Sequence, residues 1–75
     1  MSVKEPMYNT ALAEFHSQRD KAIATARIYL EHPVGIGEHP QVIDEFIKQV
    51  KLAAEAEEAA SMLVDTFRDE ITQED

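Results

Sequence analysis

Apolar side chains recur along two stretches of this chain at steps of three and four residues, a spacing typical of amphipathic helices that pack in pairs. The first stretch runs from about residue 8 to about residue 31, and the second from about residue 40 to about residue 71. The apolar positions are Tyr8, Leu12, Phe15, Ala22, Ala26 and Tyr29 in the first, and Ile43, Phe46, Val50, Ala53, Ala60, Val64, Phe67 and Ile71 in the second. This pattern predicts an all-α fold, in which an antiparallel two-helix hairpin forms a single domain of residues 1–75.

The segment between the two stretches has the composition of a chain reversal. Both glycines and two of the three prolines lie within residues 31–40. Pro33 disfavours a helical conformation in the residue before it, and Gly35 and Gly37 permit the backbone angles that a reversal needs. Pro40 suits the first turn of the second helix. These residues predict a loop over 32–39.

The two ends of the chain are less regular than the helices. Pro6 is compatible with a first helical turn, which leaves open a short extra turn before residue 8. The final residues, 72–75, are polar or acidic and predict a disordered tail.

One charged residue interrupts each apolar stripe. In an antiparallel hairpin with its turn between the glycines, facing positions place Arg19 near Ala54 and Glu57 near His16. The two interruptions therefore fall in one layer, where Arg19, Glu57 and His16 could form a hydrogen-bonded group, because an unpaired charge there is costly. Two alternatives remain open: the long side chains reach water or fix the pairing of the helices, or Arg19 contacts a ligand.

The chain is too small to be stable through one hairpin alone. About 25 cal/mol per Å² of buried apolar area roughly balances about 1.5 kcal/mol of lost entropy per ordered residue in chains of this size. There is no cysteine, so a disulfide cannot compensate. Alanines also lie on more than one face of the second helical stretch. We therefore expect hairpins to assemble into a helical-bundle homo-oligomer.

The net charge of −8 is unevenly distributed. Residues 1–37 carry four basic and four acidic side chains, whereas residues 38–75 carry three basic and eleven acidic ones. This charge opposes direct DNA or RNA binding, which needs cations along the phosphate backbone. An acidic face could instead contact a basic protein. The candidate carboxylates for such a contact are Glu55, Glu58, Asp65 and Asp69.

Basic and aromatic residues on the first helical stretch could bind a small anionic ligand, since guanidinium groups clasp phosphates and rings stack on bases. The loop glycines offer a second possibility, because the amides at the start of the following helix favour an anion. The candidate residues are Tyr8, Arg19, Lys21, Arg27, Gly35 and Gly37. The competing interpretation is an ordinary solvated helix face beside a structural turn.

Other chemistry has little support in the sequence. The repeated triplets Glu31-His32-Pro33 and Glu38-His39-Pro40 bring histidines and carboxylates together, but their spacing matches no standard zinc site. No nucleophile with a base and no cofactor fingerprint is recognisable. We expect no catalytic residues, no metal and no cofactor. The absence of a long apolar run or a signal-peptide pattern predicts a cytoplasmic protein that does not contact membranes.

The segment 22–64, with the loop sequence Tyr29-Leu30-Glu31-His32-Pro33-Val34-Gly35-Ile36-Gly37-Glu38-His39-Pro40 at its centre, resembles the small helical-hairpin proteins of tailed bacteriophages. In size and architecture the chain is also similar to phage counter-defence sponges, which are oligomeric helical proteins. This second resemblance implies a non-enzymatic protein of the host cytoplasm that sequesters a cyclic nucleotide immune signal between subunits. The alternative is an acidic interaction module that inhibits or adapts a basic host or phage protein.

Overall fold

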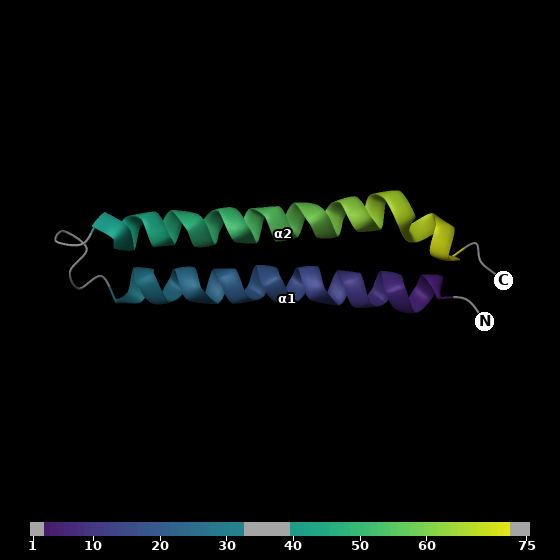
Figure 1. Ribbon diagram of the computed structural model, residues 1–75, viewed down its shortest axis with the longest axis horizontal. Helices are drawn as coiled ribbons and strands as arrows, with labels where there is room; N and C mark the ends of the chain where they lie inside the picture. The colour runs from purple at the N-terminus through teal and green to yellow at the C-terminus, as the bar shows by residue number, and fades with distance from the viewer. Residues whose placement is uncertain (1–2, 33–39, 73–75) are drawn as a thin grey trace.

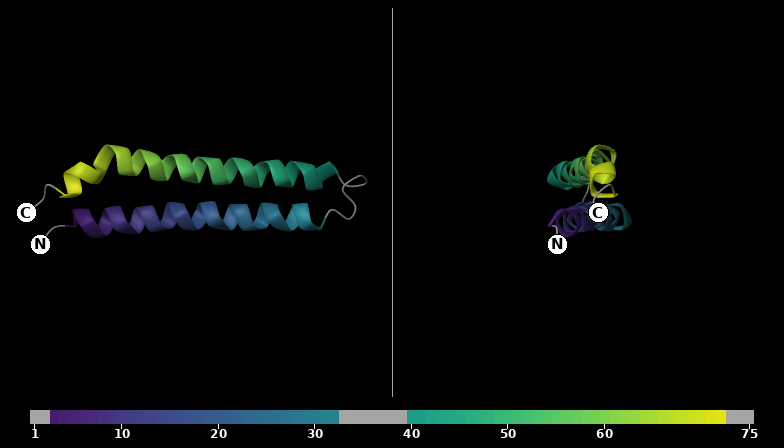
Figure 2. Two further views of the ribbon diagram at one scale, coloured as in Figure 1. Left: turned by 180° about the vertical axis from the view of Figure 1, so that it is seen from behind. Right: turned by 90° about the vertical axis from the view of Figure 1, so that its right-hand side faces the viewer.

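The computed structural model describes residues 3–32 and 40–72, and it contains two long helices there. Helix α1 spans Lys4–Glu31 and helix α2 spans Pro40–Thr72. They lie side by side and antiparallel, with the start of α1 beside the end of α2 (Figure 1). The end-on view in Figure 2 shows a molecule only one helix pair thick. The predicted all-α pair of packed helices is confirmed, and no helix within the described ranges is long and apolar enough to span a membrane.

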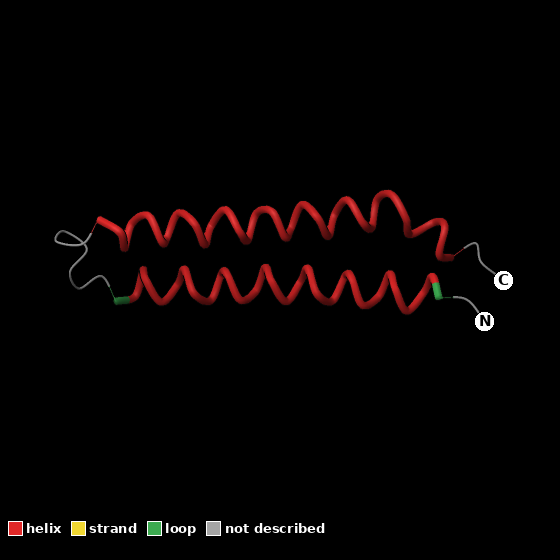
Figure 3. Tube along the Cα trace, in the orientation of Figure 1, coloured by secondary structure: helices red, strands yellow, loops and turns green. Residues whose placement is uncertain are grey.

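Helix α1 begins earlier than the expected residue 8. The N–H of Met7 donates a hydrogen bond to the carbonyl of Val3 at 3.1 Å, which closes the first turn. Pro6 fits inside this turn because the first amides of a helix have no partner within the helix. At the other end, the N–H of His32 donates to the carbonyl of Ile28 at 3.0 Å. Figure 3 shows helix between these two ends without a break.

This early start changes how the end of α2 is covered. The sequence predicts that the second helix is longer than the first, so that its last turns pack on an N-terminal arm or on another subunit. The helices have 28 and 33 residues, and the first turns of α1 run beside the last turns of α2 (Figure 1). Val64 and Ile71 are accordingly half-buried within the hairpin, although Phe67 remains exposed.

The interface between the helices is centred on four alanines, which we call the alanine seam: Ala22 and Ala26 of α1, and Ala56 and Ala60 of α2. These are the buried side chains among the described residues, and no large side chain there is fully buried. Alanine favours helix and lets two helix backbones approach closely. The hairpin therefore has a narrow line of contact and little apolar core.

The helix α2 face that meets α1 keeps only part of the predicted apolar stripe. Ala60 is buried there, and four other predicted positions are half-buried: Phe46, Ala53, Val64 and Ile71. Ile43, Val50 and Phe67 were expected at the interface, but all three are exposed. Gln49 is half-buried and Ala56 is buried in their place. Helix α2 carries two adjacent apolar stripes, and the stripe rich in alanine permits the closer approach without burying Glu57. Ile43 and Val50 are left on the side of the hairpin.

Candidate functional site

Arg19 is held by two carboxylates at one edge of the helix interface. Its Nη1 donates a hydrogen bond to Oε1 of Glu57 on α2 at 2.8 Å, and its Nε donates to Oδ1 of Asp20 at 2.9 Å. The side chains of Arg19 and Glu57 are 29% and 59% exposed, so the pair lies at the rim of the interface and not inside it. The bond to Glu57, then that to Asp20, raises the pKa of Arg19 above its ordinary value.

This arrangement confirms the predicted pairing of Arg19 with Glu57 and corrects its third member. Within the described part of the chain, no hydrogen bond joins His16 to either residue. Asp20 fills that place because it follows Arg19 directly in sequence. With two carboxylates around one guanidinium, Arg19 is poorly suited to bind an anionic ligand.

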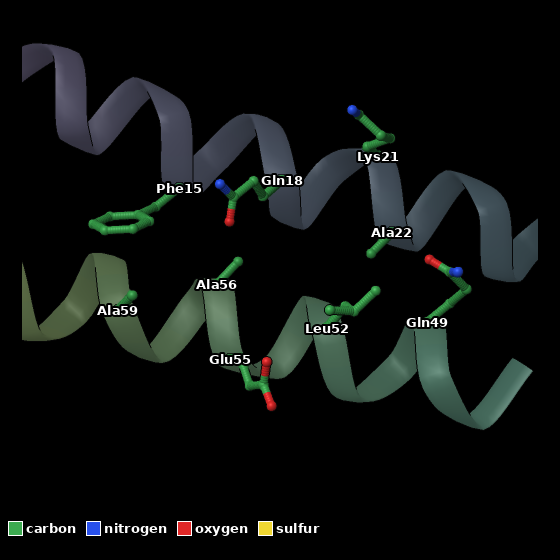
Figure 4. A pocket seen from close by; sticks show the side chains of 9 residues that line it. All are labelled: Phe15, Gln18, Lys21, Ala22, Gln49, Leu52, Glu55, Ala56 and Ala59. Carbon is green, nitrogen blue, oxygen red and sulfur yellow. The ribbon is translucent and has the colours of Figure 1, made fainter. Parts of the chain in front are cut away.

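A cleft of about 400 Å³ lies on the other side of the alanine seam. Residues of both helices line it: Phe15, Gln18, Lys21 and Ala22 of α1, and Gln49, Leu52, Glu55, Ala56 and Ala59 of α2. Figure 4 shows the Phe15 ring between the two helices and Leu52 pointing toward Ala22. The small alanine side chains leave this space open, while Phe15 and Leu52 form its apolar walls.

The polar groups of this cleft are mainly uncharged. The amides of Gln18 and Gln49 reach toward the gap from opposite helices (Figure 4). Lys21 and Glu55 contribute their stems, but their charged ends extend away from the facing helix. The cleft can therefore accommodate a ring or an apolar side chain with hydrogen-bonding groups, and by itself it offers no cluster of cations for a phosphate.

The candidate ligand residues within the described part of the chain do not converge within one hairpin. Tyr8 and Arg27 are separated by 19 positions of α1, which corresponds to about 28 Å at ~1.5 Å per residue. Lys21 lies beside the cleft, whereas Arg19 lies on the opposite side of the seam. The candidates in the loop, Gly35 and Gly37, are outside the described residues. A site that uses several of these residues would need a second subunit.

The suggested metal-binding groups are only partly within the described residues. In residues 3–32 and 40–72, no group of three or more histidine or carboxylate side chains could hold a metal ion. Glu31 and His32 are both exposed at the end of α1, and the matching Glu38 and His39 fall in the part of the chain that is not described.

An acidic stripe runs along the side of α2 that faces away from α1. It consists of Glu55, Glu58, Asp65 and Asp69, all of which are exposed. Their spacing of three, seven and four residues keeps them on one side of the helix over about 21 Å. Met62 lies in the same line and is 62% exposed. The stripe thus presents negative charge next to one large apolar side chain.

Sequence reasoning missed two features of these surfaces. Phe15 was predicted only as an interface residue, and Leu52 was not singled out. The side of the alanine seam on which each lies depends on which stripe of α2 meets α1. The exposed stripe of Ile43 and Val50 was assigned to the interface for the same reason. Comparisons with known protein families, with characterised proteins and with solved structures gave no match for this chain, so its function is inferred from its own residues.

Proposed function

We propose that this protein is a non-enzymatic interaction module, an oligomer of helical hairpins whose acidic stripe binds a basic protein. The observation that carries this function is the continuous exposure of Glu55, Glu58, Asp65 and Asp69 on the outer side of α2. A row of like charges steers an oppositely charged partner and fixes its orientation. The sequence resemblance to phage hairpin proteins is consistent with a basic host or phage protein as the partner, met in the host cytoplasm.

The oligomeric part of this proposal has its own support. The buried side chains among the described residues are four alanines, whereas ten large apolar side chains are exposed. Apolar burial is the main source of folding stability, at about 25 cal/mol per Å². In a single hairpin these exposed side chains contribute little to stability. They would contribute more if several hairpins assembled and buried them.

The acidic stripe can be tested with a defined basic probe. A fluorescent peptide of alternating lysine and arginine is titrated with the protein, and binding is measured by anisotropy at low and at physiological salt. Neutralising the stripe with E55Q, E58Q, D65N and D69N should weaken binding at least about tenfold, since several charge contacts of a fraction of a kcal/mol each are lost.

The matched control removes the same number of charges elsewhere, with E5Q, E14Q, E31Q and D44N. This variant has the same net charge as the stripe variant and should bind the peptide nearly as well as the unmodified protein. Equal weakening in both variants would show that net charge alone attracts the peptide, and the acidic stripe would then not be the binding surface.

The cleft favours a second candidate, which is sequestration of a small cyclic nucleotide between subunits. The ring of Phe15 offers a stacking surface, and the amides of Gln18 and Gln49 could read a base edge. The missing cations would come from Lys21 and from another subunit. A thermal-shift screen with cyclic di- and oligonucleotides tests this, because a ligand at 100 times its Kd stabilises by about 2.7 kcal/mol.

The variants for that screen separate the cleft from the acidic stripe. Lys21→Ala and Phe15→Leu should abolish a nucleotide-dependent shift, whereas Glu58→Ala should retain it. If no nucleotide produces a shift in the unmodified protein, sequestration is excluded for the nucleotides tested and the interaction module remains.

A further inference from the structure

Four large aliphatic side chains are exposed toward the loop end of the hairpin. We call them the aliphatic flank: Leu30 of α1 with Ile43, Ile47 and Val50 of α2. These side chains are between 47% and 63% exposed. The α2 residues follow one another at four and three positions and so share one side of the helix. Leu30 joins them across the interface, because it lines an apolar hollow of about 190 Å³ together with Ile43.

The aliphatic flank ends at a charge pair that is already satisfied. Continuing along α2 by four and three positions from Val50 leads to Ala54 and then to Glu57. Glu57 is hydrogen-bonded to Arg19 at 2.8 Å. A protein that covered this flank would therefore meet aliphatic surface and a compensated ion pair, and it would leave neither of these two charges without a partner. At the edge of the flank it would also meet charged side chains, because Ile47 lines a hollow together with Asp44 and Lys48.

The molecule exposes more surface than a compact chain of its mass. Its accessible surface is 5878 Å² at a mass of 8.5 kDa. A folded monomer of that mass is expected to expose roughly 4700 Å². The surplus of roughly 1200 Å² exceeds the ~800 Å² that each partner contributes to a standard protein interface. The elongated hairpin as a whole therefore exposes more surface than a compact monomer of its mass, which leaves area that a second copy can cover.

We infer that the aliphatic flank is the face on which two copies of this chain pair, forming a four-helix bundle. This inference rests on the oligomeric part of the proposed function and names its surface. An aliphatic patch is complementary to itself, so a two-fold axis can place the same residues of both copies in contact. A basic partner is drawn instead to the acidic stripe, which lies farther along α2 and on its outer side.

The first test places a charge in the flank and measures molar mass by sedimentation equilibrium over a range of concentrations. Ile47→Lys should raise the Kd of self-association by about tenfold or more, because a charged ammonium is disfavoured in a buried apolar contact even with Asp44 beside it. The matched control is Ile28→Lys, which adds the same charge at an exposed isoleucine on the far side of α1. This control should associate like the unmodified protein.

The possible outcomes test separately whether the aliphatic flank is the pairing face and whether the protein is an oligomer. If Ile47→Lys associates as tightly as the unmodified protein, or if Ile28→Lys is weakened equally, the aliphatic flank is not the pairing face and the oligomer stands. If the unmodified protein is a cooperatively folded monomer at micromolar concentration, the oligomeric part of the proposed function fails, and this inference fails with it.

A second measurement avoids dependence on a variant that unfolds when it cannot pair. The chain has no cysteine, so Val50→Cys and Ile28→Cys each introduce a single thiol. The rate of thiol labelling is measured as the protein concentration is raised. The Val50→Cys thiol should become at least about tenfold slower to react once pairing covers it, and the Ile28→Cys thiol should not change. Equal rates at all concentrations would overturn the pairing face.

Discussion

The two sides of the alanine seam use the same pair of helices for different surfaces. On one side, Leu30, Ile43, Ile47 and Val50 form raised aliphatic surface that ends at a satisfied ion pair. On the other, Phe15 and Leu52 stand apart and leave a cleft with two amide groups at its edge. The difference arises from side-chain size: bulky residues project beside the seam on one side, whereas alanines border the gap on the other. One hairpin can therefore offer a pairing face and a recess at the same time.

The largest effect is expected from widening the seam that separates the two surfaces. Ala56→Leu adds a branched side chain at a buried position. Overpacking of this kind costs about 1–3 kcal/mol. The free energy of unfolding, measured in urea at fixed protein concentration, should fall by that amount. Ala24→Leu is the control, since Ala24 is exposed on α1 and should tolerate leucine without loss. Equal destabilisation by both changes would contradict a close-packed seam at Ala56.

A smaller effect is expected at the end of the aliphatic flank. Glu57→Ala leaves Arg19 with Asp20 as its carboxylate partner, so covering this region by a second copy becomes less favourable. The Kd of self-association should rise by about tenfold. The double replacement of Arg19 and Glu57 by leucine should associate more tightly than the single variant. If the effects of the single replacements of Arg19 and of Glu57 by leucine add up to the effect of the double replacement, the two residues act independently.

The smallest effect is expected from pH, and it concerns the same pair. Hydrogen bonds from Arg19 to Glu57 and Asp20 raise the pKa of the guanidinium above its ordinary value. A raised pKa contributes stability that is fully present below the ordinary value and is lost only as pH climbs past the folded one. The coupling between Arg19 and Glu57, measured by a double-mutant cycle, should therefore be the same at pH 7 and pH 9. If the coupling weakens between pH 7 and pH 9, a group other than the Arg19 guanidinium must contribute to it.

Helix content, the reversal and the partner of Arg19 could all be anticipated from the sequence, because each depends on local spacing and charge. The stripe of α2 that meets α1 could not be predicted from the sequence. Ile43 and Gln49 compete for the interface, and the choice depends on how closely two backbones approach at Ala22 and Ala56. The separation of the candidate ligand residues could be predicted only in part. Lys21 and Arg19 lie on opposite sides of the alanine seam, and the sequence does not show where that seam lies.

The length of the hairpin affects how the protein moves through a solution. Its extents are 59 × 17 × 14 Å, so it is close to a short rod. Its radius of gyration is 17.0 Å. A compact domain of equal chain length is expected to have a radius of gyration of only about 11 Å. One isolated chain would therefore elute from a sizing column ahead of a globular protein of the same mass. Elution volume alone would mistake a single hairpin for an assembly, and only absolute mass from light scattering or sedimentation equilibrium can count the chains.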